Sequence, residues 1–154
     1  MFFPDMQLAA GEMYRVLKPG GRIATSVWGP PDMNNWVTTI MSVIRKHIEL
    51  PPPTPDAPGM FRCAAPGFIA AIFKQAGFKQ TEETVITGQV DFQSFDRYWE
   101  MMMEVAAPIV AALVNADEAT IAAIKAETAE LFLSKNKDNT AVLDYGALVI
   151  YAEK

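Results

Sequence analysis

The sequence predicts an α/β protein that is built on a small three-stranded sheet with helices on its flanks. Three observations support this prediction. A helix-to-strand turn lies near the amino end, polar and apolar residues alternate in part of Lys79–Phe92, and an apolar run closes the chain at Ala141–Ala152. Segments with helical spacing of apolar residues lie between them. We expect a single domain over residues 1–154, with a helical insertion at about residues 94–135.

The amino-terminal segment is expected to form a helix, a turn and a strand. Asp5 can cap a helix over Met6–Val16, because its carboxylate accepts from the free amides of the first turn. Pro19-Gly20-Gly21 ends this helix, since proline cannot continue it and glycine permits the positive φ of a reversal. The apolar run Ile23–Trp28 then follows as a strand. The helix residues that we expect to face the sheet are Leu8, Ala9, Met13, Val16 and Leu17.

The second helix is expected to run from a cap at Asn34 or Asn35 to about His47. His47 is the only histidine of the chain and therefore the candidate general base. Its position in the last turn, beside Lys46, favours a solvated helix end over a catalytic role. The apolar stripe of this helix consists of Trp36, Ile40, Val43, Ile44 and Ile48.

The middle of the chain predicts a loop, a link and a third helix. Residues 50–58 are rich in proline, and a spacer is a more common role for such a loop than a ligand for a partner. Met60–Cys63 is expected to be a short extended link, with Cys63 as a small apolar residue. Pro66 is expected in the first turn of a helix that Gly77 ends. The strand over Lys79–Phe92 follows.

The helical insertion is expected to contain an interrupted helix and a longer one. Ser94 can cap the first helix, and Pro108 should kink or break it. The second begins at Asp117-Glu118, because acidic residues favour the amino end of a helix. A polar turn over Lys135–Asn139 leads to the last strand. Residues expected on one side of the first helix are Phe95, Trp99, Met102, Met103 and Ala106, and those expected inward on the second are Ile121, Ile124, Thr128, Leu131 and Phe132.

Composition excludes several classes of function. The chain has 13 basic and 18 acidic residues and a formal net charge of −5, whereas phosphate binding needs clustered Lys and Arg. One cysteine excludes an internal disulfide, and no apolar run approaches the ~20 residues of a membrane span. No dinucleotide-binding fingerprint, P-loop, metal-ligand cluster or Cys/His pair occurs. We therefore expect a soluble, cytoplasmic protein with no nucleic-acid and no membrane partner.

Several short phrases occur in an order that is typical of one enzyme family. They are Pro4-Asp5, Arg15-Val16-Leu17-Lys18-Pro19-Gly20-Gly21, Trp28-Gly29, Asn35-Trp36, Ala76-Gly77-Phe78, Phe95 with Tyr98-Trp99, and Tyr151-Ala152. This order resembles the carboxyl-terminal half of class I S-adenosylmethionine (SAM)-dependent methyltransferases that are related to quinone biosynthesis. The resemblance implies a partial Rossmann-like methyltransferase fold. It also implies a small mixed sheet in which the last strand lies antiparallel between the other two.

The resemblance further implies that the SAM-binding half is missing. Such enzymes bind SAM mainly through the loops after their first three strands, and no such strands precede Met1. We therefore expect no cofactor for the isolated chain, with SAM bound only if a site is rebuilt with a partner, and no methyltransferase activity of the chain on its own. Segments that line the acceptor pocket in these enzymes give the ligand-pocket candidates Trp28, Trp36, Phe61, Phe95, Trp99 and Met103. For the helix that carries Trp99, packing onto the sheet is the alternative.

The missing half would also leave the strand Ile23–Trp28 without a neighbour. Apolar strand edges aggregate unless they are covered, and neither lysine nor proline interrupts this run. We therefore expect a homodimer through this edge, or a hetero-oligomer, by two-fold strand pairing or by a swap of the amino-terminal helix. The oligomer-edge candidates are Ile23, Thr25 and Val27.

Three functions remain open from the sequence. The first is a non-catalytic module that binds a small apolar molecule or a protein and acts as an oligomer. The second is a subunit that completes a SAM-dependent methyltransferase with a separate cofactor-binding half. The third is an inactive, truncated gene product. We rank them in the order first, third and second.

Overall fold

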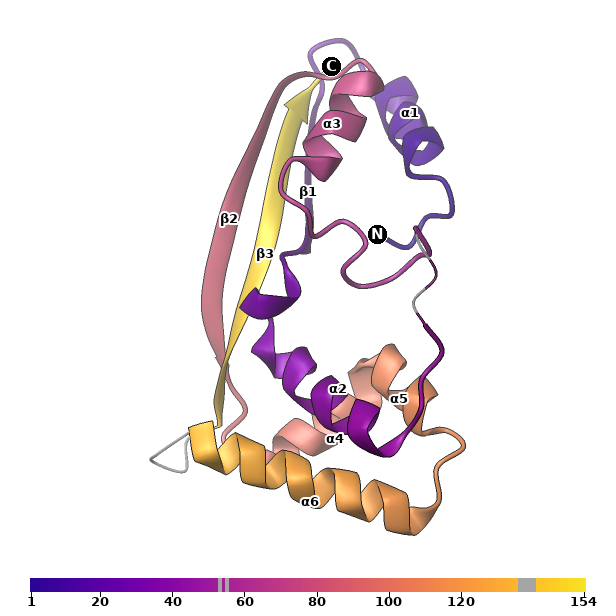
Figure 1. Ribbon diagram of the computed structural model, residues 1–154. Coiled ribbons are helices and arrows are strands. Elements are labelled where there is room, and N and C mark those ends of the chain that lie inside the picture. The colour runs from indigo at the N-terminus through magenta and orange to yellow at the C-terminus, as the bar shows by residue number, and fades with distance from the viewer. Residues whose placement is uncertain (53, 55, 136–140) are drawn as a thin grey trace. The chain divides into compact units, whose positions relative to one another are not determined.

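The computed structural model describes residues 1–154 except 53, 55 and 136–140, so parts of the predicted 50–58 loop and Lys135–Asn139 turn lie outside the described residues. Figure 1 shows the helices and strands. In chain order they are α1 (Met6–Val16), β1 (Arg22–Trp28), the 3-10 helix η1 (Pro31–Met33), α2 (Asn35–His47), α3 (Phe68–Gln75), β2 (Lys79–Asp91), α4 (Phe95–Val105), α5 (Ala107–Leu113), α6 (Glu118–Lys135) and β3 (Val142–Glu153).

The three strands form one sheet in the order β1-β3-β2, with β3 between the other two (Figure 1). β1 pairs antiparallel with β3, from Arg22 opposite Glu153 to Trp28 opposite Ala147. This arrangement confirms the α/β fold class, the strand order and the antiparallel insertion of the last strand. Because β3 runs antiparallel to both neighbours, the sheet itself is antiparallel and not mixed. β1 and β2 are therefore the two edge strands of the described sheet.

The chain divides into two compact units. Unit 1 consists of Met1–Met33, Pro53–Thr87 and Gly146–Lys154, and unit 2 consists of Asn34–Pro52 and Gly88–Tyr145. Both β2 and β3 begin in one unit and end in the other. The predicted helical insertion at residues 94–135 lies in unit 2, with α2. That the whole chain behaves as a single domain stays a prediction.

Unit 1 is built from α1, α3 and the sheet residues beneath them. Asp5 caps α1 as predicted, because its carboxylate accepts from the Leu8 N–H at 2.8 Å. Tyr14 of α1 meets Phe78 edge to face, with ring centroids 5.1 Å apart. Cys63 is a free, fully buried thiol in this core, which confirms its apolar role. The other buried residues of the core are Ala10, Val27, Ile69, Phe73, Phe78, Leu148, Ile150 and Ala152.

Unit 2 is organised around Tyr98 of α4. Its fully buried ring lies against Phe92 and Phe132, with ring centroids 5.2 and 5.1 Å away. Its hydroxyl donates to the Trp36 carbonyl at 2.9 Å. Burial raises the pKa of Tyr98 far above its ordinary value, so the hydroxyl stays protonated and can donate. The helices around it bury Val37, Ile40, Val43, Ile44, Ile109, Leu113 and Ile124.

The buried side of α1 differs from the predicted one. Ala10 is buried and Tyr14 packs against the core, whereas Leu8 and Val16 are 65% and 66% exposed. Apolar residues occur on more than one side of this helix, so spacing alone did not identify the side that packs inward. The prediction was right for Met13 and Leu17, which pack against the core, and wrong for Leu8 and Val16.

Two local predictions around α3 were also wrong. Met60–Cys63 forms turns and not an extended link. The helix begins at Phe68, so Pro66 lies before its first turn. The reason is Gly67, which precedes the helix in the left-handed region at φ 78° and donates its N–H to Glu83 Oε1 at 2.9 Å.

Candidate functional site

The open edge of β1 presents the backbone groups of alternate residues. Gly29 N–H donates to the Gly146 carbonyl at 2.9 Å in register with the β1·β3 pairing. Antiparallel ladders alternate, so the odd-numbered residues of β1 direct their backbone groups at β3. The N–H and C=O groups of Ala24 and Ser26 therefore point to the opposite edge, where no strand of the described chain pairs with them.

The predicted edge residues Ile23, Thr25 and Val27 lie on the inner face of β1. Val27 is buried, and the other two are half-buried. The backbone groups of these three residues face β3, so the residues contribute only side chains to the edge region. The outward hydrogen-bonding groups come from Ala24 and Ser26. The exposed outer face carries Arg22, Ala24 and Ser26.

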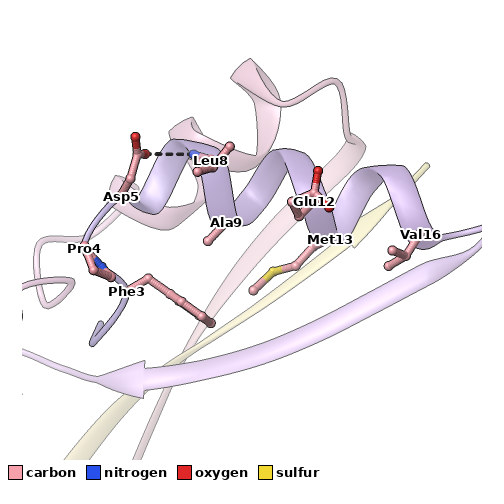
Figure 2. Close-up of a pocket in the computed structure, with 8 residues that line it drawn as sticks. All are labelled: Phe3, Pro4, Asp5, Leu8, Ala9, Glu12, Met13 and Val16. Atoms are coloured by element: carbon pink, nitrogen blue, oxygen red, sulfur yellow. Dashed lines mark hydrogen bonds between the residues drawn. The ribbon is translucent and has the colours of Figure 1, made fainter.

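An apolar groove lies along α1 and is lined both by its exposed Leu8 and Val16 and by Met13, which packs against the core. Its volume is about 540 Å³, and almost all of its surface comes from apolar atoms. Figure 2 shows that its lining comes from one continuous segment, α1 and the residues just before it. The lining residues that matter below are Phe3, Leu8, Ala9, Glu12, Met13 and Val16.

The groove continues onto β1. Phe3, Ala9 and Met13 line the groove and also line a small cavity of about 50 Å³ beneath α1, together with Thr25 and Val27 of β1. In Figure 2 the Met13 side chain extends from α1 towards the strand. The groove and β1 are therefore neighbours, and we call residues 3–16 and 22–28 together the α1–β1 surface.

The charges in the groove are compensated within the same segment. The Asp5 carboxylate is occupied as the cap of α1. Glu12 accepts a hydrogen bond from Arg15 Nε at 2.9 Å and lies 2.8 Å from Nη2 of the same side chain. This hydrogen bond and the positive charge of Arg15 lower the pKa of Glu12. An apolar partner would therefore cover Glu12 as an ion pair and Asp5 as a hydrogen-bonded helix cap.

The six ligand-pocket candidates fall in both units. Trp28 and Phe61 belong to unit 1, and unit 2 holds Trp36, Phe95, Trp99 and Met103. In unit 2, the Phe95 and Trp99 ring centroids lie 6.3 Å apart. Trp36 and Trp99 are 7% and 8% exposed, and Trp36 Nε1 donates to the Asn34 side chain at 3.1 Å. The grooves and cavities described here are lined by other residues, and a ligand pocket at these six stays a prediction.

His47 pairs with a residue that the sequence reasoning missed. Its Nε2 lies 2.7 Å from Glu127 Oε2 of α6, and Lys46 also donates to the Glu127 carboxylate. Hydrogen bonds from Lys46 and His47 lower the pKa of Glu127. A separate hollow of about 540 Å³, lined partly by His47, Leu50 and Thr120, lies next to this pair. The contacts join α2 to α6, and no sequence pattern links residues 80 positions apart.

The described residues hold no group of three or more His, Cys, Asp or Glu side chains that could bind a metal ion. No described helix has both the length and the apolar character that crossing a membrane requires.

No protein-family model matches the chain. Among solved structures, it is similar to a proposed methyltransferase from Bacillus halodurans at 17% identity and a TM-score of 0.47; the match covers 99% of this chain and 64% of that protein. It is also similar to Haemonchus contortus phosphoethanolamine N-methyltransferase 2. The complex of that enzyme with phosphomonomethylethanolamine and S-adenosylhomocysteine matches at 16% identity, and the SAM complex at 15%.

The two Haemonchus matches have TM-scores of 0.39 and 0.38, and they cover 99% of this chain but only 31% and 30% of the enzyme. The chain thus spans less than two thirds of each methyltransferase that it resembles.

Proposed function

We propose that this chain is a non-catalytic, methyltransferase-like interaction module that acts as an oligomer through its α1–β1 surface. One observation carries the proposal. Three lining residues of the α1 groove share a small cavity with Thr25 and Val27 of β1, the strand whose outer edge is open at Ala24 and Ser26. A partner that covers it would gain backbone hydrogen bonds and apolar burial together.

Exposed apolar residues at this surface support an interaction role. Phe3, Leu8 and Val16 are 50%, 65% and 66% exposed, and all three line the groove. Clustered exposed apolar side chains next to polar ones are typical of interaction sites, whereas scattered ones are ordinary. Because Glu12 is paired with Arg15, a partner that covers the groove meets an ion pair and not a lone carboxylate.

Sizing and cofactor titration test this proposal. Light scattering across micromolar concentrations should give an oligomer, and isothermal titration with SAM and S-adenosylhomocysteine should give no binding heat for the isolated chain. A mass of 16.9 kDa at every concentration would contradict the oligomer. SAM binding at micromolar strength would contradict the non-catalytic assignment and would favour a cofactor site that is rebuilt between copies.

A small apolar molecule is the second candidate occupant of the groove, because about 540 Å³ lies within the usual range of ligand sites. The fluorescent probe 1-anilinonaphthalene-8-sulfonate distinguishes the two occupants. If a protein partner covers the groove, the probe should bind weakly to the oligomer. Strong probe fluorescence that Leu8→Glu removes, without any change in mass, would favour the small molecule.

A further inference from the structure

We propose that the partner at the α1–β1 surface is a second copy of this chain, joined by antiparallel pairing of the two β1 strands about a two-fold axis at Thr25. This inference rests on the proposed function, because it names the partner of the same surface. The sequence Arg22–Trp28 is complementary to itself in this arrangement, in its hydrogen bonds, its side-chain pairs and its charges.

The backbone alternation fits a two-fold axis at Thr25. The outward N–H and C=O groups of Ala24 then lie opposite those of the partner's Ser26, and each pair can exchange two hydrogen bonds. Thr25 meets the partner's Thr25 as a non-hydrogen-bonded pair, with about 4.5 Å between Cα atoms. If the register shifted by one residue, the outward N–H and C=O groups of one copy would lie opposite odd-numbered residues of the other copy, whose N–H and C=O groups already bond to β3.

The side chains match on both faces. On the inner face, Ile23 lies opposite the partner's Val27, and the two Thr25 side chains meet. On the outer face, Arg22 lies opposite the partner's Trp28. Arg22 Nε already lies 3.4 Å from Glu153 Oε2 of β3, and the exposed remainder of its guanidinium can sit over the indole ring. Registers centred on Ala24 or Ser26 shorten the overlap and separate this cation from the aromatic ring.

Charge favours the antiparallel direction. Arg22 is the only charged residue of β1 and stands at its first position. Parallel pairing in register would place the two Arg22 side chains next to each other, and like charges directly opposite destabilise a sheet. Antiparallel pairing separates them by six residues, about 20 Å.

The same axis brings the two α1 helices onto one side of the joined sheets, because both Thr25 side chains point to the inner face. Each helix carries its exposed Leu8 and Val16 in the groove, whose residues Ala9 and Met13 share a small cavity with Thr25. The second copy would therefore cover the apolar groove as well as the strand, and Glu12 would enter the interface already paired with Arg15.

Single-cysteine cross-linking tests the register. Ala24→Cys, Thr25→Cys and Ser26→Cys are each oxidised mildly with oxidised glutathione, and the products are separated without reductant. Only Thr25→Cys should form a covalent dimer, because its Cα atoms lie within disulfide range, whereas the two copies of residue 24 or 26 lie more than about 7 Å apart. Thr84→Cys on β2 controls for random collision, and the native Cys63 is buried.

The outcomes separate this inference from the proposed function. A dimer that links at residue 24 or 26, and not at 25, would overturn the register while the interaction module stands. A dimer that links at none of the three would overturn β1 pairing altogether. A wild-type chain that stays monomeric would overturn both the inference and the proposed function.

Discussion

The two edges of the sheet differ in how they are protected. β2 carries Lys79, Glu82, Glu83 and Asp91 along its length, whereas β1 carries only Arg22, at its first position. Charged side chains are a common device that keeps edge strands from pairing with other chains. The difference supports the proposal that a partner covers β1, while the charged side chains of β2 protect the other edge.

A proline on β1 should have the largest effect. Ala24→Pro removes an outward N–H but leaves the pairing with β3 intact, since edge strands tolerate proline where the N–H points away from the sheet. We expect the dimer dissociation constant, measured by sedimentation equilibrium, to rise about 100-fold or more.

Two variants control for this proline. Ala24→Val keeps the N–H and should keep the wild-type mass, and Thr84→Lys adds a charge to β2 and should also leave the mass unchanged. If the proline has no effect, or if Thr84→Lys dissociates the dimer, the contrast between the two edges is wrong.

A charge in the helix groove should have the next largest effect. Leu8→Glu places a carboxylate where we propose that the second copy buries an apolar side chain, which should weaken the dimer about tenfold. Leu133→Glu is the matched control, because Leu133 is 50% exposed on α6 of unit 2 and lies outside the α1–β1 surface. Equal weakening by both variants in sedimentation would show that general charge repulsion, and not the groove, is responsible.

Loss of a buried hydrogen bond in unit 2 should lower the free energy of unfolding and leave the mass of the oligomer unchanged. Tyr98→Phe removes the hydrogen bond to the Trp36 carbonyl, which should lower the free energy of unfolding by about 1 kcal/mol in a denaturant titration. Tyr151→Phe should lower it less, because the Tyr151 hydroxyl is only half-buried and 3.4 Å from Glu153. If Tyr98→Phe dissociated the dimer, the stability of unit 2 and the association of the two copies would not be independent properties.

The smallest expected effect concerns acid stability. The lowered pKa of Glu127 means that its contribution is present above the ordinary value of 4.5 and is lost as pH falls through the lower, folded-state pKa. Glu127→Gln should therefore flatten the acid limb of thermal stability below about pH 4.5 relative to the wild-type chain. An unchanged acid limb would show that the contacts with Lys46 and His47 contribute nothing measurable.

Most helix ends could be predicted from the sequence because the residues that determine them lie within the same turn of the chain. The Asp5 cap, the Pro19-Gly20-Gly21 turn, the Ser94 cap and the break before Pro108 each act within one turn of the chain, and the structure places helix ends at all of them. The strand order followed from the resemblance and not from spacing.

Contacts between distant residues could not be predicted in this way. Glu127 contacts His47 only after α2 and α6 pack together. Tyr98 has a more polar side chain than Trp99 beside it, yet it is the more deeply buried of the two. Only the strand part of the α1–β1 surface was predicted from the sequence. The open strand was expected at Ile23–Val27, but the groove beside it was missed because Leu8 and Val16 were assigned to the buried side of α1.

Hydrogen exchange at two amides tests most directly whether the β1 edge is covered. The N–H groups of Ala24 and Ser26 point away from β3, so in a monomer they exchange quickly with solvent, and in the proposed dimer they are hydrogen-bonded and slow. We predict strong protection of both amides in the wild-type chain and rapid exchange of Ser26 in Ala24→Pro. Rapid exchange of both amides in the wild type, at concentrations where Thr25 is protected by β3, would contradict the account.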